Sequence, residues 1–169
     1  MEAAENIAAK RHMEQLPLVT QLPVEHLFDM HVGLQPAQAI PTALGARMTF
    51  ITTGGRVDGP RLRGEILPGG GDWLQVGSDA VGRVDVRATL RTEDDCLIHY
   101  EARGVIKIPP DGLARLAAGE VLPFAETYAR TTPSFETSDE RYAWLSGAVC
   151  LAFNVLSPDH IDYRIYKIL

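Results

Sequence analysis

The sequence predicts a mainly β protein, a single-domain antiparallel β-barrel with one or two short helices. Glycines and prolines divide residues 54–87 into short strand-like segments at 61–67, 72–76 and 81–87. Residues 81–91 alternate between apolar and polar side chains, as a strand with one buried face does. The chain has 169 residues and is 46% hydrophobic, enough for one domain with a substantial core. Short strands joined by tight turns are typical of a closed or nearly closed sheet.

The chain divides into an N-terminal extension, residues 1–20, and a barrel domain, residues 21–169. Residues 1–15 are rich in Ala and Glu, and both a short helix and a mobile segment stay open for them. Pro17 and Pro23 then favour an extended lead-in. We find no internal repeat and no linker, which indicates one domain.

The first long strands are expected at residues 26–34, which alternate weakly, and at 45–53, which alternate better. The clearest hairpin joins residues 81–91 to 96–108 through an acidic turn. A three-residue turn sets Arg87 beside Glu101 and Asp85 beside Arg103. This register pairs opposite charges and keeps the apolar faces together, so we favour it.

The C-terminal third continues with shorter elements. Two prolines at 109 and 110 end the second hairpin strand, and Asp111 can cap a short helix over 112–118. Residues 124–130 look extended, and a turn of helix is expected over 140–145. The apolar segment 147–156 and the alternating segment 161–169 complete the chain, the latter as the closing strand.

Composition excludes several classes of function. A net charge of −6 argues against a nucleic-acid partner, which needs a basic face. No run reaches the roughly 18 apolar residues of a membrane helix, and the polar N-terminus is no signal peptide or anchor. Cys96 and Cys150 match no metal or redox spacing, and buried thiols in a reducing compartment are favoured over a disulfide. We therefore expect a cytoplasmic protein without a membrane partner, and apolar strand edges favour a homo-oligomer.

Several separated motifs resemble the uncharacterised UPF0311 family, also called DUF3237. They are GGRVDGPRLRGEILPGGGDW, VDVRATLRTEDD, RTTPSFET and YAWL, and the resemblance runs from about Gly45 to the C-terminus. It implies a small β-barrel with a shared site region, and it implies no reaction. The chain departs from the pattern that we expect of the family at Gly77, Ala80, His99 and Ala129. If those positions line the pocket, the ligand of this chain differs from that of its relatives.

Asp85 and Arg87 are the first candidate pair, because they lie two apart on one side of a strand. If that side faces the lumen, Arg87 can hold a carboxylate or enolate oxygen while Asp85 orients it or moves a proton. The alternative is a solvated outer face with ion pairs to Arg103 and Glu101, which implies nothing about function.

The other candidates each have a structural alternative. Asp72 and Trp73 follow a glycine run that can approach a ligand or form a barrel corner. Glu136 suits a general base at a barrel mouth, or it pairs with Arg130 to hold the loop. The remaining candidate ligand-binding residues are Arg47, Tyr100, Tyr142 and Trp144. Core packing is the alternative for Tyr142 and Trp144, and a backbone or water partner for the hydroxyl is the alternative for Tyr100.

The sequence carries no recognisable metal or cofactor motif. The five histidines show no HxH or HExxH spacing, and His26 and His31 are five apart, which suits neither a helix face nor one side of a strand. The GxGxxG and GxSxG signatures are absent. We therefore expect no cofactor and no metal, although a metal site assembled from distant residues stays open.

These observations favour a cofactor-independent enzyme that acts on a small oxygenated metabolite, aromatic ones included, in a barrel pocket. Asp85 or Glu136 would move a proton, and Arg87, Arg130 or Arg47 would hold an anionic oxygen, in an isomerase, cyclase, lyase or hydrolase reaction. One alternative is a barrel that binds a small molecule without chemistry, as a carrier or sensor. Another is an interaction protein whose barrel is filled by side chains.

Overall fold

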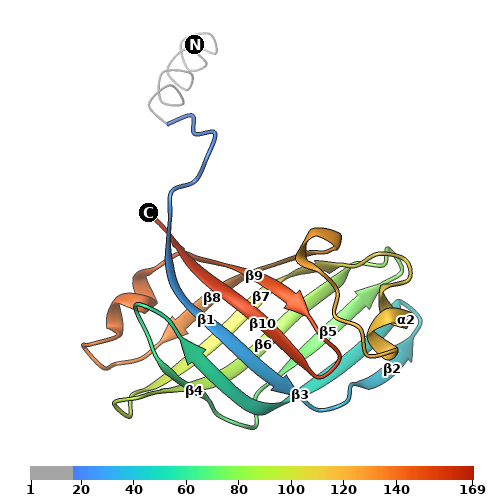
Figure 1. Cartoon of the computed structure of the whole chain (residues 1–169), viewed down its shortest axis with the longest axis horizontal. Coiled ribbons are helices and arrows are strands. Elements are labelled where there is room, and N and C mark those ends of the chain that lie inside the picture. The colour runs from blue at the N-terminus through green and yellow to red at the C-terminus, as the bar shows by residue number, and fades with distance from the viewer. Residues whose placement is uncertain (1–16) are drawn as a thin grey trace, which may run out of the picture.

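A computed structural model describes residues 17–169 and shows one closed antiparallel barrel (Figure 1). The strands are β1 (Val24–Leu34), β2 (Gln38–Thr42), β3 (Gly45–Asp58), β4 (Gly64–Ile66), β5 (Gly71–Gly77), β6 (Gly82–Thr92), β7 (Leu97–Lys107), β8 (Tyr128–Glu136), β9 (Cys150–Leu156) and β10 (His160–Ile168). Among residues 17–169, the connections contain one short helix, α2 (Gly112–Ala117), and two 3₁₀ turns, η1 (Phe124–Glu126) and η2 (Ala143–Gly147).

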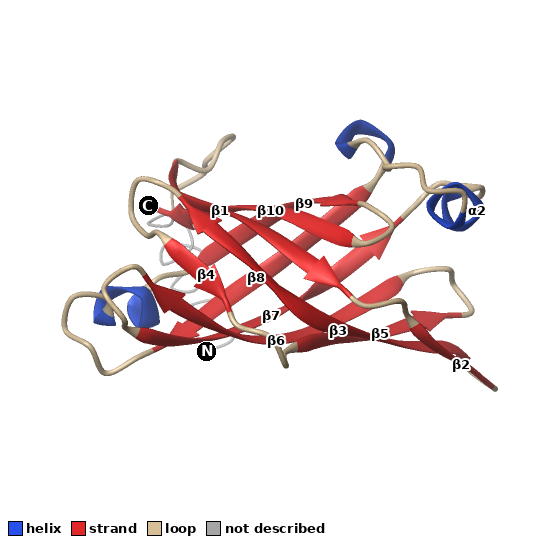
Figure 2. Ribbon diagram, turned by 60° about the horizontal axis from the view of Figure 1, so that its bottom comes forward, coloured by secondary structure: helices blue, strands red, loops and turns tan. Residues whose placement is uncertain are grey.

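The strand order closes the sheet on itself. The strands follow the order β1-β10-β9-β8-β7-β6-β4-β3, and β1 pairs with β3 to complete the circle (Figure 2). The short strands β4 and β5 both bridge β3 and β6, so eight positions surround the core. Closure removes the unpaired edges that an open sheet of this size would expose. The predicted fold class is confirmed.

The predicted hairpin is confirmed in its register. Arg87 lies opposite Glu101 and Asp85 lies opposite Arg103 on β6 and β7. The apolar face of this hairpin points into the barrel, while the charged face points outward. The buried side chains on the inward face are Val84, Val86, Leu90, Ile98, Tyr100 and Ala102. Their burial removes apolar surface from water, which stabilises the fold by roughly 25 cal/mol per Å².

Side chains from the strands all round the barrel meet in its interior. Phe28 from β1, Tyr100 from β7 and Phe135 from β8 pack edge to face, with ring centroids 5.8 and 5.5 Å from Phe135. Leu90, Ile98 and Ile165 are almost inaccessible to solvent. The interior is therefore a packed core, and the first groove described below lies on the outer surface of the barrel. Both cysteines are buried free thiols, as expected.

Several elements differ from the prediction. The expected helix over 140–145 is the 3₁₀ turn η2, and residues 124–126 form the 3₁₀ turn η1 rather than extended chain. In the segment 61–67 only Gly64–Ile66 is a strand. Strand β2 was not predicted, because Pro41 lies within it and proline is tolerated only on an edge strand such as this one. The expectations for residues 1–15 lie outside the described residues.

Candidate functional site

A groove of about 910 Å³ lies on the outer surface of β1, β3, β9 and β10. Its volume falls in the range of pockets that hold small molecules. The groove, called the β10 groove below, is lined by charged and aromatic side chains that point away from the packed interior: Asp29, His31, Arg56, Asp58, Phe124, Phe153, Asp162, Arg164 and Tyr166.

The alternation of β10 builds one wall of this groove. His160, Asp162, Arg164 and Tyr166 share the outer face of the strand, whereas Tyr163 and Ile165 point into the core. The pairing of β1 with β10 then brings the outer face of β1 alongside: His31 lies directly opposite Asp162, and Asp29 lies opposite Arg164. The first and last strands of the barrel thus supply the polar groups.

Two ion pairs organise the polar part of the groove. The Arg164 guanidinium donates two hydrogen bonds to the Asp29 carboxylate, at 2.9 and 2.6 Å. Arg164 thereby lowers the pKa of Asp29, and His26 adds a contact of 2.8 Å to the same carboxylate. The second pair is His31 Nδ1 with Asp162 Oδ1 at 2.7 Å, with half of each side chain exposed. Nearby, His160 Nε2 lies 3.5 Å from the other Asp162 oxygen.

Aromatic rings form another part of the groove lining. Phe153 packs on Phe124 and on Tyr166, with ring centroids 5.4 Å apart in both cases. Arg130 stacks its guanidinium over Phe124 and Phe153, 4.4 and 4.5 Å from their centroids. This cation–π arrangement fixes the rings that face the groove. The groove therefore offers a flat apolar wall beside acids, bases and guanidinium groups.

The predicted pair Asp85 and Arg87 lies on the outer face of β6, away from the β10 groove. Arg87 contacts Asp85 at 2.7 Å and Glu101 at 3.2 Å, and Arg103 reaches Asp85 at 3.5 Å. About a third of the Asp85 side chain and two fifths of that of Arg87 are exposed. The condition that this face lines the lumen is thus not met, because the lumen takes the alternating apolar residues. The arrangement is the surface ion-pair alternative.

Two predicted residues lie in the interior. Asp72 is 6% exposed, and burial raises the pKa of its carboxyl to about 6. Tyr100 is also buried, and its hydroxyl has no hydrogen-bond partner among the described residues. Burial raises its pKa, and the Asp72 charge adds to this effect. Burial also raises the pKa of Tyr163 on β10, and the charges of Tyr100 and Asp72 add to this effect.

The other predicted residues are dispersed. Trp73 and Arg47 are exposed on β5 and β3, and Glu136 is exposed at the end of β8, opposite His99. Arg130 contacts the aromatic rings described above, and no ion pair joins it to Glu136 among the described residues. The structure therefore brings the side chains of Asp85 and Arg87 together on the outer face of β6, places Asp72 in the interior, and does not assemble the predicted set.

Tyr142 and Trp144 flank the start of η2 rather than sharing a strand face. The Tyr142 hydroxyl donates to Asp94 at 2.9 Å, and Arg61 lies 4.6 Å above the Trp144 ring. Both side chains also pack against the core cluster. Of the positions where the chain departs from the family pattern, Gly77, Ala80, His99 and Ala129, none is among the residues that line the groove.

Sequence reasoning missed most of the groove. The alternation of residues 160–166 marks a polar face on the closing strand, which is a signal for His160, Asp162 and Arg164. Nothing local indicates that His31 meets them, because that contact depends on pairing between strands 131 residues apart. No helix among residues 17–169 is long and apolar enough to cross a membrane.

Known proteins share both the sequence pattern and the fold. A UPF0311 protein of Clostridium acetobutylicum is 28% identical over 125 residues, covering 74% of this chain and 79% of the relative. The crystal structure of a conserved protein of unknown function from Rhodopseudomonas palustris matches with a TM-score of 0.83 at 22% identity, over 89% of this chain and all of that one. A structure described as an enzyme from Penicillium herquei matches with a TM-score of 0.66 at 21% identity, over 91% and 99% of the two chains.

The family model described as a protein of unknown function, DUF3237, matches residues 22–168, which is the whole barrel. The resemblance inferred from the sequence motifs is thereby confirmed: this chain belongs to the DUF3237 family, whose members include the UPF0311 proteins.

Proposed function

We propose that the chain is an enzyme that moves a proton on a small oxygenated molecule, aromatic ones included, bound in the β10 groove. The observation that carries this proposal is the His31–Asp162 contact of 2.7 Å on the wall of a groove of about 910 Å³. A histidine held by a carboxylate, and open to a hollow of ligand size, is the usual equipment of acid–base catalysis.

Each part of the groove has a role in this proposal. An ionised Asp162 only accepts hydrogen bonds, so His31 donates through Nδ1 and keeps Nε2 as the proton acceptor. Arg56 lies opposite His31 on β3 and supplies a positive charge for a developing oxygen anion. Phe153 and Tyr166 offer flat faces for an aromatic ring. Isomerisation, cyclisation, elimination and hydrolysis all use this combination of a base and an anion-binding group.

The second candidate is binding without chemistry. It is favoured by the Asp29–Arg164 pair, whose charges already satisfy one another through two hydrogen bonds. Such a closed pair serves to shape a groove and has little capacity left to stabilise a transition state. The Penicillium herquei protein described as an enzyme shares the fold with this chain, and a fold alone supports several functions.

The test compares the protein with two histidine variants. Tag-free protein is incubated with a metabolite extract, and consumed and formed compounds are followed by mass spectrometry. We expect the protein to convert an oxygenated compound, and His31→Asn to lower that rate at least about 100-fold. The matched control is His99→Asn, an exposed histidine 3.5 Å from Glu101 and outside the groove, which should keep the rate within about twofold.

Two results would decide against catalysis at this place. Equal rates for the protein and for His31→Asn would remove the histidine from the reaction. A compound that co-purifies with the protein, is lost in a Phe153→Ala variant and is recovered unchanged after incubation would favour the binding alternative.

A further inference from the structure

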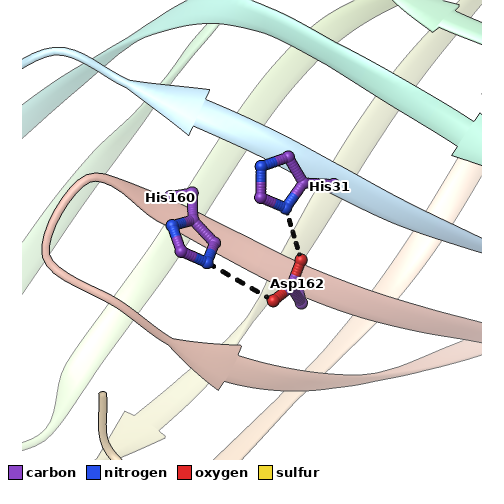
Figure 3. Close-up of side chains that lie close together, drawn as sticks. All are labelled: His31, His160 and Asp162. Atoms are coloured by element: carbon purple, nitrogen blue, oxygen red, sulfur yellow. Dashed lines mark hydrogen bonds and ion pairs between the residues drawn. The ribbon is translucent and has the colours of Figure 1, made fainter.

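His31, His160 and Asp162 form a compact cluster (Figure 3), and His31 and Asp162 also line the β10 groove. His160 and Asp162 are two apart on the outer face of β10, and His31 lies across from Asp162 on β1. All three side chains start from paired strands of the closed barrel, so their Cα positions are fixed by backbone hydrogen bonds.

The three side chains are close enough to share one ion. One ligand atom of each, two imidazole nitrogens and a carboxylate oxygen, lies within 4.8 Å of the other two. Bonds of 2.0–2.2 Å to a tetrahedral ion would place such atoms roughly 3.4 Å apart, so small side-chain rotations close the set. In Figure 3 the His31 and His160 rings both turn a nitrogen toward Asp162, one to each oxygen.

The hydrogen bonds of His160 leave a nitrogen lone pair facing this centre. Its Nδ1 lies 2.7 Å from Oδ1 of the Asp159 carboxylate. An ionised carboxylate only accepts, so Nδ1 carries the proton and Nε2 of the neutral ring carries a lone pair. That lone pair then faces an Asp162 oxygen at a distance of 3.5 Å. Both atoms are hydrogen-bond acceptors, so the contact becomes favourable when a proton or a cation lies between them.

The contact to Asp159 resembles the outer carboxylates that orient metal-binding histidines. Ligating imidazoles commonly donate their other N–H to a carboxylate, which fixes the tautomer and the ring. The negative charges of Asp159 and Asp162 would also offset the charge of a bound cation. The Arg56 guanidinium, opposite His31 on β3, contributes a positive charge nearby. The exposure of His31 and Asp162, about half of each side chain, leaves coordination positions open toward the groove.

We propose that His31, His160 and Asp162 bind one divalent transition-metal ion, with Zn²⁺ as the probe. Two imidazoles and one carboxylate suit Zn²⁺ and its neighbours rather than Mg²⁺ or Ca²⁺, which prefer oxygen ligands. Three protein ligands with open positions match a reactive metal site rather than a structural one. The inference goes beyond the proposed function and does not depend on it: a metal ion would take the His31 nitrogen that faces Asp162, so the metal-bound form and the form in which His31 accepts a proton are alternative states of one groove. Metal binding is measured without any other ligand.

The experiment uses the full chain, free of any tag and treated with a chelator. Isothermal titration with Zn²⁺ at pH 7.5 should show one bound ion per chain, and Co²⁺ should give the visible absorption of a low-symmetry site. Asp162→Asn and His160→Asn should each weaken binding about 100-fold. Asp159→Asn should weaken it about tenfold, because it acts through the orientation of His160.

The matched control is His26→Asn. His26 also lies on β1 and contacts a carboxylate, Asp29, at 2.8 Å, but it does not belong to the three-residue cluster. This variant should bind Zn²⁺ as the unmodified protein does. Circular dichroism checks that each variant folds. We expect the variants to fold, because the substituted side chains are partly exposed.

Two outcomes would overturn the inference: absence of Zn²⁺ binding at pH 7.5, or binding that survives both Asp162→Asn and His160→Asn. The proposed function fails separately, through equal conversion rates of the protein and the His31→Asn variant. Zn²⁺ bound as expected together with such equal rates would keep the metal site and remove the reaction.

Discussion

Asp72 Oδ1 accepts a hydrogen bond from the backbone N–H of Asp85 at 3.0 Å, so a side chain completes the pairing of β5 with β6. The two strands pair normally on either side, at Asp72–Val86 and at Gln75–Arg83. Between these points the Asp72 carboxyl takes the place of a backbone carbonyl. The carboxyl is also buried, which raises its pKa to about 6. The protonation state of this group in the barrel wall therefore changes with pH near that value.

We predict that Asp72 makes the protein less stable as the pH rises from about 4 to 6. Its pKa is raised in the folded state above the ordinary 3.8, so in this window the folded chain holds a proton that the unfolded chain has lost. The stabilising effect of that proton disappears above pH 6. The free energy of unfolding of Asp72→Asn, relative to the unmodified protein, should therefore rise by about 2 kcal/mol between pH 4 and pH 7.

Urea unfolding at several pH values measures this difference. The asparagine keeps an oxygen for the Asp85 N–H, so the fold is retained. Asp79→Asn is the control, because Asp79 is exposed and Arg83 lowers its pKa to about 2, outside this pH window. A pH-independent difference for Asp72→Asn would show that the buried carboxyl does not titrate in this range.

The strand patterns near this site could be predicted, because they depend on neighbours in the sequence. Alternation over residues 81–91 identified the inner face of β6, and charge pairing identified the register of Arg87 with Glu101. The family motifs then supported the fold class that these patterns predict. Each of these signals joins residues that are close along the chain or linked by one short turn, where turn length restricts the register.

The groove could not be predicted in the same way. His31 meets Asp162 only because the first strand pairs with the last, and the sequence contains no signal for the register of that closure. The lumen was expected to hold a pocket, yet large side chains such as Phe28, Phe135 and Ile165 fill it. Whether a barrel of this size is hollow depends on the summed volume of side chains from all strands, which local patterns do not report.

We predict that Tyr100→Phe raises the free energy of unfolding by about 1 kcal/mol. The Tyr100 hydroxyl is buried without a partner among the described residues, and removing an unsatisfied buried polar group is favourable. The ring keeps its contact with Phe135, 5.5 Å between centroids. The control is Tyr128→Phe, half exposed, with an expected change within about 0.5 kcal/mol. A loss of stability on Tyr100→Phe would reveal that an internal water or ligand bonds this hydroxyl.

We predict that Asp85→Asn and Arg87→Gln each change the free energy of unfolding by less than about 1 kcal/mol. Their ion pairs are partly exposed on the outer face of β6, where solvent and salt weaken them. Both variants should also keep the conversion rate measured for the unmodified protein. Thermal unfolding and the conversion assay check these expectations together. A variant that folds stably but loses conversion would instead support the site that the sequence predicts at Asp85 and Arg87.

We predict that Gly55→Ala lowers the free energy of unfolding by about 3 kcal/mol and reduces groove function with it. A Cβ at this position would lie 2.1 Å from the His31 carbonyl oxygen, where β1 pairs with β3 to close the barrel. The strands must separate to relieve this overlap, and overpacking of this kind is destabilising. Gly147→Ala is the control, because its Cβ would meet no atom within 4 Å, and we expect a change within about 0.5 kcal/mol. Urea unfolding compares the two variants, and equal stabilities would mean that the closure tolerates separation.

Because His31 lies at this same crossing, Zn²⁺ binding should weaken in Gly55→Ala even where the chain remains folded, which connects closure of the barrel to the geometry of the groove.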